Sequence, residues 1–294
     1  EVTSEGMLQH RHRFINFHAS VFTNLSPEHI ERHGSFENYK RTKGKLFAAA
    51  RDVHVINADD EHSPFFLQFP AKEIYVYGIH PKPGLGASKL SLGGNVVADE
   101  HGVRFSVDDV EFHLNLLGRF NASNALAAVA VARSFSISLQ VCSMALAKMV
   151  VVPGRMELVV QEPFRAVVDY AFTPAALEKV YQALKPKEGK MICVLGAAGG
   201  GRDKWKRPVL GKIAATYCDK IILTNEDPYE EDPEKIIHEV YGGTQGRGEI
   251  IVDRREAIRT ALSQAQPGDV VVITGKGSED SIAIQGGKRI PWDD

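Results

Sequence analysis

Four short apolar runs in the second half of the chain decide the fold. They read Arg165-Ala-Val-Val-Asp169, Lys190-Met-Ile-Cys-Val-Leu195, Lys220-Ile-Ile-Leu-Thr224 and Asp269-Val-Val-Val-Ile-Thr274. Each is apolar at consecutive positions, which is the pattern of a strand that helices cover on both faces of a sheet. A weaker run at Glu249–Val252 extends the series.

Helical patterns separate these strands. They occupy Pro174–Leu184, Arg207–Tyr217, Pro233–Tyr241 and Arg254–Ala265. Regular alternation of strand and helix predicts parallel strands joined by right-handed crossovers. We therefore predict a doubly wound, Rossmann-like α/β domain over residues 153–294.

The first half is less regular. We predict strands at Ala19–Asn24, Asp52–Asn57 and Glu73–Tyr77, and helices at Phe36–Ala49, Asn121–Ser134 and Leu139–Met149. The stretch Lys89–Leu117 indicates β-hairpins with Gly93-Gly94 as a turn. Val151-Val152-Pro153-Gly154 breaks helix and indicates a junction. Residues 1–152 are therefore predicted to form a separate domain of strands and helices.

Length and charge limit the classes of function. A chain of 294 residues is long enough for two domains. The formal net charge of −2 gives no reason to expect a nucleic acid as partner. No apolar run approaches the ~20 residues that span a bilayer, and we find no signal peptide, so we predict a cytoplasmic protein without a membrane partner. The chain opens on Glu1 rather than Met, which we interpret as a fragment or a processed chain.

The three cysteines, Cys142, Cys193 and Cys218, are far apart in sequence and lie in apolar stretches. This pattern predicts buried free thiols in a reducing compartment.

Glycine-rich or charged segments follow four of the predicted strands. They are Asp169–Pro174, Gly196–Lys204, Asn225–Pro228 and Gly275–Glu279. Because the carboxyl ends of parallel strands meet at one edge, we predict a ligand site there, although each segment alone could be a solvated loop. Gly199–Gly201 could bring backbone amides to an anion at a helix N-terminus. Neither that run nor Gly275-Lys276-Gly277 fits the phosphate-loop pattern G-x-x-x-x-G-K-[ST].

Two polar pairs mark the first half. His29 and His33 are four residues apart and would share a helix face. They could form a zinc pair, but without a third ligand nearby a single histidine beside a hard cation or a phosphate is favoured. Asn121 and Asn124 are three apart at a helix start and could face one ligand; the alternative is that they cap the helix.

Together these segments resemble the Mur ligases, and within them the UDP-N-acetylmuramoyl-tripeptide synthetase branch. The matching segments, in the family's order, are Glu1–Gly6, Gln9–Arg11, Val21–His29, Tyr39–Lys43, Gly118–Asn124, Gly154–Glu157, Asp169–Pro174, Gly201–Pro208, Asp227-Pro228 and Gly275–Glu279. The resemblance implies that residues 1–152 are a central domain with a mixed sheet and helices that lacks its N-terminal part with the phosphate loop, and that residues 153–294 are the C-terminal domain. It also implies an ATP- and Mg²⁺-dependent ligase of peptidoglycan synthesis. Such an enzyme adds an amino acid to UDP-N-acetylmuramoyl-L-alanyl-D-glutamate through an acyl phosphate.

The resemblance also implies roles for individual residues. Glu1, His29 and Lys43 match the metal site, where Lys43 would be carbamylated; from spacing alone Lys43 would be a solvated helix lysine. His29 and Lys43 are therefore the implied catalytic residues. The implied nucleotide contacts are Asn121, Asn124, Arg155 and Asp169. The implied contacts to the UDP-sugar are Thr3, Gln9 and Arg11. The implied contacts to the incoming amino acid are Arg202, Asp227, Gly275 and Glu279.

Three positions depart from the family pattern. Tyr229 stands where members that use diaminopimelate carry an arginine for the distal carboxylate, which argues against that amino acid. Asp227 and Glu279 could instead receive a side-chain ammonium, as in lysine or ornithine. Phe172 and Ser278 replace histidines of the family pattern.

Two other functions compete with this interpretation. One is another ligase of the superfamily, such as a folylpolyglutamate synthetase, and the other is a nucleotide-binding remnant without catalysis. The sequence contains no phosphate loop, so we expect little or no turnover by this chain alone. We also expect a monomer.

Overall fold

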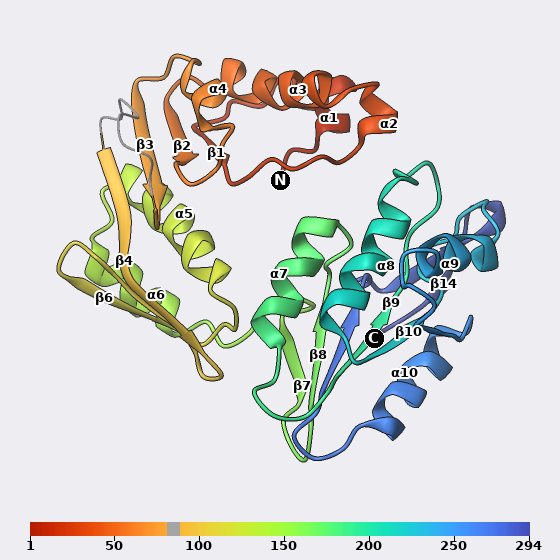
Figure 1. Cartoon of the computed structure of the whole chain (residues 1–294). Helices are drawn as coiled ribbons and strands as arrows, with labels where there is room; N and C mark the ends of the chain where they lie inside the picture. The colour runs from red at the N-terminus through yellow and green to blue at the C-terminus, as the bar shows by residue number, and fades with distance from the viewer. Residues whose placement is uncertain (81–88) are drawn as a thin grey trace. The chain divides into compact units, whose positions relative to one another are not determined.

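The computed structural model describes residues 1–80 and 89–294, and it divides into two compact units, Glu1–Val150 and Val151–Asp294 (Figure 1). The division falls two residues before the boundary predicted from the sequence. In the described residues, no helix combines the length and the apolar character that crossing a membrane requires.

The first unit is built on a six-stranded mixed sheet with the strand order β1-β2-β3-β4-β5-β6. Strands β1 to β4 are parallel to one another, whereas β5 pairs antiparallel with both β4 and β6. The strands are β1 (Ala19–Phe22), β2 (Val53–Asn57), β3 (Glu73–Gly78), β4 (Lys89–Asp99), β5 (Gly102–Val107) and β6 (Val110–Leu114). The helices are α1 (Ser4–Leu8), α2 (Ile30–His33), α3 (Phe36–Ala49), α4 (Ser63–Leu67), α5 (Phe120–Ser134) and α6 (Leu139–Ala147).

Both faces of the parallel strands are buried, because successive side chains of a strand point to opposite faces. Val53 and Val55 of β2 pack in one cluster with residues of α5, such as Leu126. Ile56 belongs to a second cluster, on the opposite face, with Phe47 of α3 and residues of α4. The sheet therefore has α5 on one face and α3 with α4 on the other.

The predicted turn at Gly93-Gly94 is wrong, because both glycines lie inside β4. The hairpin loops are instead Glu100-His101 and Asp108-Asp109. A Cβ atom on Gly93 would lie 2.9 Å from Cδ1 of Leu126. Gly93 thus lets α5 pack closely on the strand, a tertiary requirement that resembles a turn signal in the sequence.

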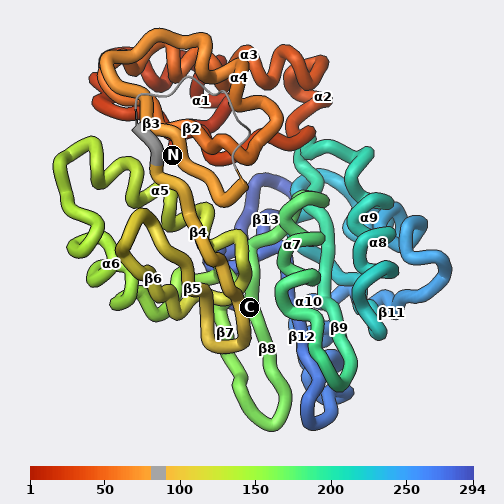
Figure 2. Tube along the Cα trace, turned by 60° about the vertical axis from the view of Figure 1, so that its left-hand side comes forward, coloured from red at the N-terminus to blue at the C-terminus, as the bar shows by residue number. Residues whose placement is uncertain are grey.

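The second unit contains a six-stranded sheet with the order β11-β10-β9-β12-β8-β7. Its first five strands are parallel, as predicted, and the edge strand β7 is antiparallel. Figure 2 shows β8, β12 and β9 side by side. The elements are β7 (Glu157–Val160), β8 (Arg165–Asp169), α7 (Pro174–Leu184), β9 (Met191–Leu195), α8 (Lys206–Tyr217), β10 (Lys220–Leu223), α9 (Pro233–Tyr241), β11 (Glu249–Ile250), α10 (Arg254–Gln264) and β12 (Val270–Thr274).

Helices cover both faces of this sheet (Figure 1). Ala257 and Ala261 of α10 pack against one face, where Val194 of β9 is buried. The helices α7 and α8 lie together on the other face. A short antiparallel hairpin, β13 (Ser281–Ile284) and β14 (Lys288–Pro291), with η1 (Gln285–Gly287) between its strands, completes the unit. The predicted doubly wound α/β fold is confirmed.

Capping side chains explain why several helices begin where the sequence predicts. Ser35 accepts a hydrogen bond from the backbone N–H of Asn38 at 3.1 Å and fixes the start of α3. Asp253 accepts one from Glu256 at 2.9 Å at the start of α10. Such N-caps satisfy backbone donors that have no partner within the helix.

The prediction of three free thiols is wrong. Cys193 of β9 and Cys218, the residue that ends α8, form a disulfide, and their Cα atoms are 6.1 Å apart. The crossover through α8 brings the chain back beside β9, so 25 residues of sequence separation become direct contact. Cys142 is free and buried.

Candidate functional site

In the first unit, the side chains of His29, His33 and Lys43 lie around the ring of Tyr39, and Glu1 acts electrostatically on Lys43. We call them the Tyr39 cluster: Glu1, His29, His33, Tyr39 and Lys43. Tyr39 and Lys43 are four residues apart on α3 and share a face. The Lys43 Nζ lies 5.6 Å from the centre of the Tyr39 ring. The rings of His29 and His33 lie 6.0 Å and 5.3 Å from it.

Burial lowers the pKa of Lys43 below its ordinary value, and the negative charge of Glu1 acts in the opposite direction. An ammonium removed from water is destabilised relative to the neutral amine. The structure therefore brings Glu1 within electrostatic reach of Lys43 and makes that lysine easier to deprotonate than a solvated one. The alternative of a fully solvated helix lysine does not describe Lys43.

The expectation that His29 and His33 share a helix face is wrong. His29 precedes α2 in a left-handed conformation, with φ of 58°, and only His33 belongs to the helix. The Nε2 of His33 is 3.0 Å from Oγ of the buried Ser4, a hydrogen bond that joins α2 to α1. Burial, together with the charge of His29, lowers the pKa of His33. Within residues 1–80 and 89–294, no group of three or more His, Cys, Asp or Glu side chains could hold a metal ion.

The three residues assigned to the UDP-sugar lie at and just after α1. Thr3 caps this helix by accepting a hydrogen bond from the backbone N–H of Gly6 at 3.0 Å. Gln9 ends the helix, and the backbone N–H of Arg11 donates to Gly6 O at 2.9 Å. All three side chains are exposed. Thr3 is therefore next in sequence to Ser4, which contacts His33 of the Tyr39 cluster. Gln9 and Arg11 lie past the opposite end of the helix.

Asn121 and Asn124 lie in the first turn of α5 and contact each other. Asn124 Nδ2 donates to Asn121 Oδ1 at 2.9 Å, and Asn121 Nδ2 donates to Leu117 O at 2.7 Å. The capping alternative is wrong, because the helix begins at Phe120 and its N-cap is Arg119. Asn121 is thus held by the backbone and in turn orients the exposed Asn124.

In the second unit, a buried lysine joins the two carboxylates assigned to the amino-acid pocket. Lys276 Nζ lies 2.9 Å and 3.0 Å from the two carboxylate oxygens of Asp227, and 2.5 Å from Glu279 Oε2. The Tyr170 hydroxyl donates to Glu279 Oε1 at 2.9 Å. We call these four residues the Lys276 network. Asp227 and Glu279 were expected to be open to a substrate ammonium, but they bind an internal one.

Hydrogen bonding determines the protonation of this network. Burial alone disfavours the ammonium of Lys276, but its bonds to Glu279 and Asp227 outweigh that effect and raise its pKa. Burial and the bond to Glu279 raise the pKa of Tyr170. Sequence analysis missed both residues as site residues. The signal was there: Lys276 precedes Glu279 by three residues within a segment already singled out.

Glu226 is a third carboxylate at this rim, and sequence analysis also missed it. Burial raises its pKa to about 7, and the positive charge of Arg254 is the largest effect in the opposite direction. Its Oε2 is buried and accepts no hydrogen bond from any residue that the structure describes. A Cβ atom on Gly275 would lie 2.4 Å from this oxygen. Gly275 therefore places backbone directly against the Glu226 carboxylate.

Asp169 ends β8, and Arg155, which precedes β7, contacts Tyr170 directly after that strand. The Asp169 carboxylate accepts hydrogen bonds from the backbone N–H groups of Met156 at 2.8 Å and Ala171 at 2.7 Å. Burial raises its pKa in spite of these bonds. The Arg155 guanidinium stacks on Tyr170, 4.3 Å from the ring centre. Arg155 therefore lies next to the Lys276 network, and Asp169 fixes the turn that carries Arg155.

The glycine run 199–201 does not open a helix, because α8 begins only at Lys206. Gly199 donates its backbone N–H to Asp227 O at 2.8 Å, and a Cβ atom there would lie 2.3 Å from Pro228 O. The run thus packs on the Asp227-Pro228 segment, which corrects its predicted role as a helix-terminal anion cradle. The half-buried Arg202 follows directly, its N–H donating to Gly199 O at 3.2 Å. Arg202 and Asp227 are therefore brought onto adjoining segments.

The positions that depart from the family pattern lie around this rim. Lys206 Nζ is 4.9 Å from the centre of the Phe172 ring. Tyr229 has φ of 52° and its ring lies against Gly200. Ser278 is exposed. Two aromatic rings thus stand where the family pattern has a histidine and an arginine.

Both units are α/β folds, and the Lys276 network of the second unit follows the carboxyl ends of its parallel strands β8, β10 and β12, the arrangement of ligand-binding α/β proteins. Two family models match the chain: the Mur ligase middle domain over residues 1–132, and the Mur ligase, glutamate ligase domain over residues 154–277. The chain belongs to the Mur ligase family, whose members are ATP-dependent, amide-bond-forming ligases.

Individual relatives point to one branch. The chain is 39% identical to the UDP-N-acetylmuramyl-tripeptide synthetase of Roseiflexus sp. (strain RS-1), over 100% of this chain and 62% of the relative. It is 40% identical to the UDP-N-acetylmuramoyl-L-alanyl-D-glutamate–2,6-diaminopimelate ligase of Aquifex aeolicus (strain VF5), over 98% and 59%. A solved structure of a ligase with the latter name has a TM-score of 0.56 and 32% identity, covering 99% of this chain and 61% of that one. The chain spans about three fifths of these relatives.

Proposed function

We propose that this chain supplies the middle and C-terminal domains of a UDP-N-acetylmuramoyl-tripeptide synthetase. In the proposed reaction ATP phosphorylates the terminal carboxylate of UDP-N-acetylmuramoyl-L-alanyl-D-glutamate. The amine of a free amino acid then attacks the acyl phosphate, and phosphate leaves. The observation that carries the proposal is likeness over at least 98% of the chain to relatives named for this reaction. The enzyme would act in the cytoplasm, as a monomer.

The Tyr39 cluster fits the proposed metal and phosphate side of the reaction. Lys43 is partly buried beside an aromatic ring, and burial lowers its pKa. Its neutral amine therefore forms more readily than that of a solvated lysine. Reaction of that amine with carbon dioxide would give a carbamate anion near Glu1. Two such anions, with His29 close by, suit Mg²⁺, which prefers oxygen ligands and retains water and phosphate oxygens. The bound ion would neutralise charge on the transferring phosphoryl group.

Nucleotide binding is assigned to four residues. Asn121 and Asn124 would contact the adenine, with Asn124 oriented by its bond from Nδ2 to Asn121. Asp169 would accept from ribose hydroxyls with the lone pairs that its two backbone bonds leave. Arg155 would contact the phosphates or ribose from its position on the Tyr170 ring.

The amino-acid pocket is assigned to the rim around the Lys276 network. Arg202 would bind the α-carboxylate as a bidentate pair. Tyr229 replaces the arginine that would grip a second carboxylate, so we infer a diamino acid without one, such as lysine or ornithine. Because Lys276 already occupies Asp227 and Glu279, Gly275 and Glu226 remain to face the distal amine.

A chimaera tests the reaction, because the chain spans only part of its relatives. The N-terminal two fifths of the Aquifex aeolicus relative would be joined to this chain, and phosphate release from ATP measured. Release should require both the UDP-linked dipeptide and an amino acid. Lysine, ornithine, diaminopimelate and glutamate would be compared, with the complete Aquifex aeolicus enzyme as control. Phosphate release that ignores the amino acid would contradict the ligase proposal. Preferred use of diaminopimelate would contradict only the inference from Tyr229.

A further inference from the structure

The disulfide closes the segment that carries the proposed amino-acid contacts. Cys193 lies in the middle of β9 and Cys218 is the C-cap of α8, so the bond joins a central strand to the residue that directly follows a helix. The 25-residue separation includes the glycine run 199–201 and Arg202. Both cysteines are buried, with Cys193 0% and Cys218 3% exposed. The bond thus links the two ends of one strand–loop–helix segment, and the loop of that segment carries the proposed site residues.

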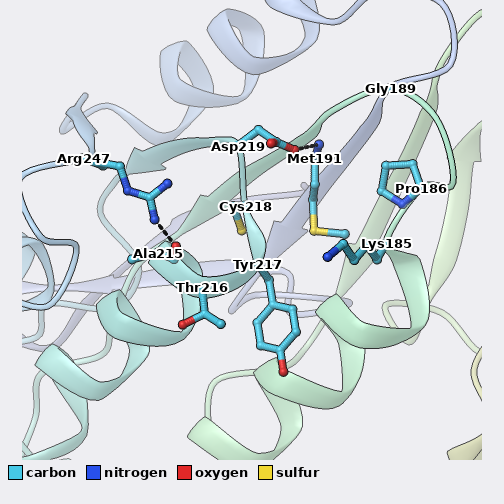
Figure 3. A pocket seen from close by; sticks show the side chains of 10 residues that line it. All are labelled: Lys185, Pro186, Gly189, Met191, Ala215, Thr216, Tyr217, Cys218, Asp219 and Arg247. Carbon is cyan, nitrogen blue, oxygen red and sulfur yellow. Dashed lines mark hydrogen bonds between the residues drawn. The ribbon is translucent and has the colours of Figure 1, made fainter.

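A cavity of about 270 Å³ reaches one end of this bond (Figure 3). It lies where β9 and β10 begin, at the sheet edge opposite the Lys276 network, and Cys218 lines it. Two cations, Lys185 and Arg247, line the same cavity, as does Asp219, whose carboxylate accepts the backbone N–H of Met191 at 2.8 Å. Arg247 donates to Ala215 O. Positive charge near a thiol favours its thiolate form, which is the reactive one.

We propose that Cys193 and Cys218 form a reversible thiol–disulfide exchange site whose co-reactant is a dithiol. One thiolate of the dithiol attacks Sγ of Cys218 from the cavity. The bond between the two protein sulfurs breaks, its electron pair passes to Sγ of Cys193, and that sulfur takes up a proton. The second thiolate of the dithiol then attacks the first sulfur of the same molecule, which is bonded to Sγ of Cys218 in the mixed disulfide. Cys218 leaves as a thiolate. The protein disulfide gains two electrons, and the dithiol becomes a disulfide.

Burial and chemistry favour a dithiol over a single thiol. A mixed disulfide on Cys218 lies beside the released Cys193 thiol, which can attack it and restore the original bond. A second thiol in the same reductant competes with that reversal, because its attack is intramolecular. In compartments that keep thiols reduced, disulfides that do form are usually transient and redox-sensing. The pair is therefore a means of loosening or tightening the segment around Arg202.

Wild-type chain tests the proposal without any substitution. Thiols would be counted with a chromogenic disulfide in denaturant, after exposure to oxidised dithiothreitol and again after reduced dithiothreitol. We expect one thiol, Cys142, in the first state and three in the second. Loss of the cross-link should lower the melting temperature of the second unit by about 5–10 °C. Three thiols in the oxidised sample, or equal melting temperatures, would overturn the proposal.

Matched controls separate the pair from other effects. A Cys193→Ala/Cys218→Ala variant should melt at the same temperature with and without dithiothreitol, whereas a Cys142→Ala variant should keep the full difference. Mercaptoethanol at equal thiol concentration should reduce the native chain at least tenfold more slowly than dithiothreitol. Equal rates for the two reductants would refute the dithiol requirement. A redox shift that persists in the double variant would refute the site.

Discussion

Two lysines, one in each unit, show how neighbours decide what a buried amine does. Lys43 lies beside the ring of Tyr39, and burial lowers its pKa although Glu1 opposes the shift. Lys276 is 1% exposed and touches Asp227 and Glu279, whose hydrogen bonds raise its pKa in spite of burial. The first lysine is made easier to deprotonate, and the second is held as a cation.

The difference separates a reactive amine from an internal counter-ion. Desolvation acts on both ammonium groups in the same direction, so only the acceptors around each one explain the opposite outcomes. A carbamate can form only from a neutral amine, which suits Lys43. Lys276 instead pairs with the carboxylates of Asp227 and Glu279. It offsets their negative charge and holds the two side chains in place. Three substitutions test this contrast, beginning with the largest expected effect.

Replacing Lys276 by methionine should cost the second unit about 3–5 kcal/mol of stability. The substitution keeps most of the length of the unbranched side chain but leaves the largely buried Asp227 carboxylate without its cation. Urea unfolding followed by tryptophan fluorescence measures this unit, because Trp205 and Trp292 both lie in it. Lys204→Met is the matched control: that lysine pairs with Glu231 at the surface and should cost less than about 1 kcal/mol.

A second variant locates the cause of that loss. Adding Asp227→Asn to Lys276→Met removes the stranded charge and should recover part of the stability, because contacting residues do not contribute additively. If Lys276→Met costs no more than the Lys204→Met control, the network is not the counter-ion system described here.

Replacing Lys43 by alanine should reduce turnover of the chimaeric ligase by about 10²–10³-fold. That is the usual loss when one group that stabilises developing charge is removed from an active site. Lys45→Ala on the same helix is the control, because Lys45 is exposed. Melting temperatures within a few degrees of the parent would show that both variants fold. Unchanged turnover of the Lys43→Ala variant would rule out the carbamate.

The order of strands and helices could be predicted from the sequence because it depends on local patterns. The bounds of α3, α7, α9 and β8 match the predicted residues, since caps such as Ser35 and runs of buried β-branched residues are visible in the sequence. Gly93-Gly94 was misread because its cause lies in Leu126, a residue 33 positions away. The short helices α1, α2 and α4 escaped prediction because each is only one turn or slightly longer.

The site was predictable as segments but not as contacts. Sequence patterns singled out Gly275–Glu279 and Asn225–Pro228, yet they could not show that Lys276 bridges the two. The disulfide was missed for the same reason: the return of α8 to β9 is a property of the folded sheet. The left-handed conformation of His29 likewise separates it from the helix that its spacing with His33 suggests.

Glu226 extends the contrast to a carboxylate, and Glu226→Gln should make the second unit more stable at high pH. Burial raises the pKa of Glu226 to about 7, against an ordinary 4.5. Between those values the folded state holds a proton that the unfolded state has released, so stability falls as pH rises through this window. The shift corresponds to about 3.5 kcal/mol at 1.4 kcal/mol per pKa unit. Urea unfolding should therefore show equal stability of wild type and Glu226→Gln near pH 4.5, and a clear advantage of the variant at pH 8. The exposed Glu234→Gln serves as control, and an advantage that does not change with pH would contradict the titration of Glu226.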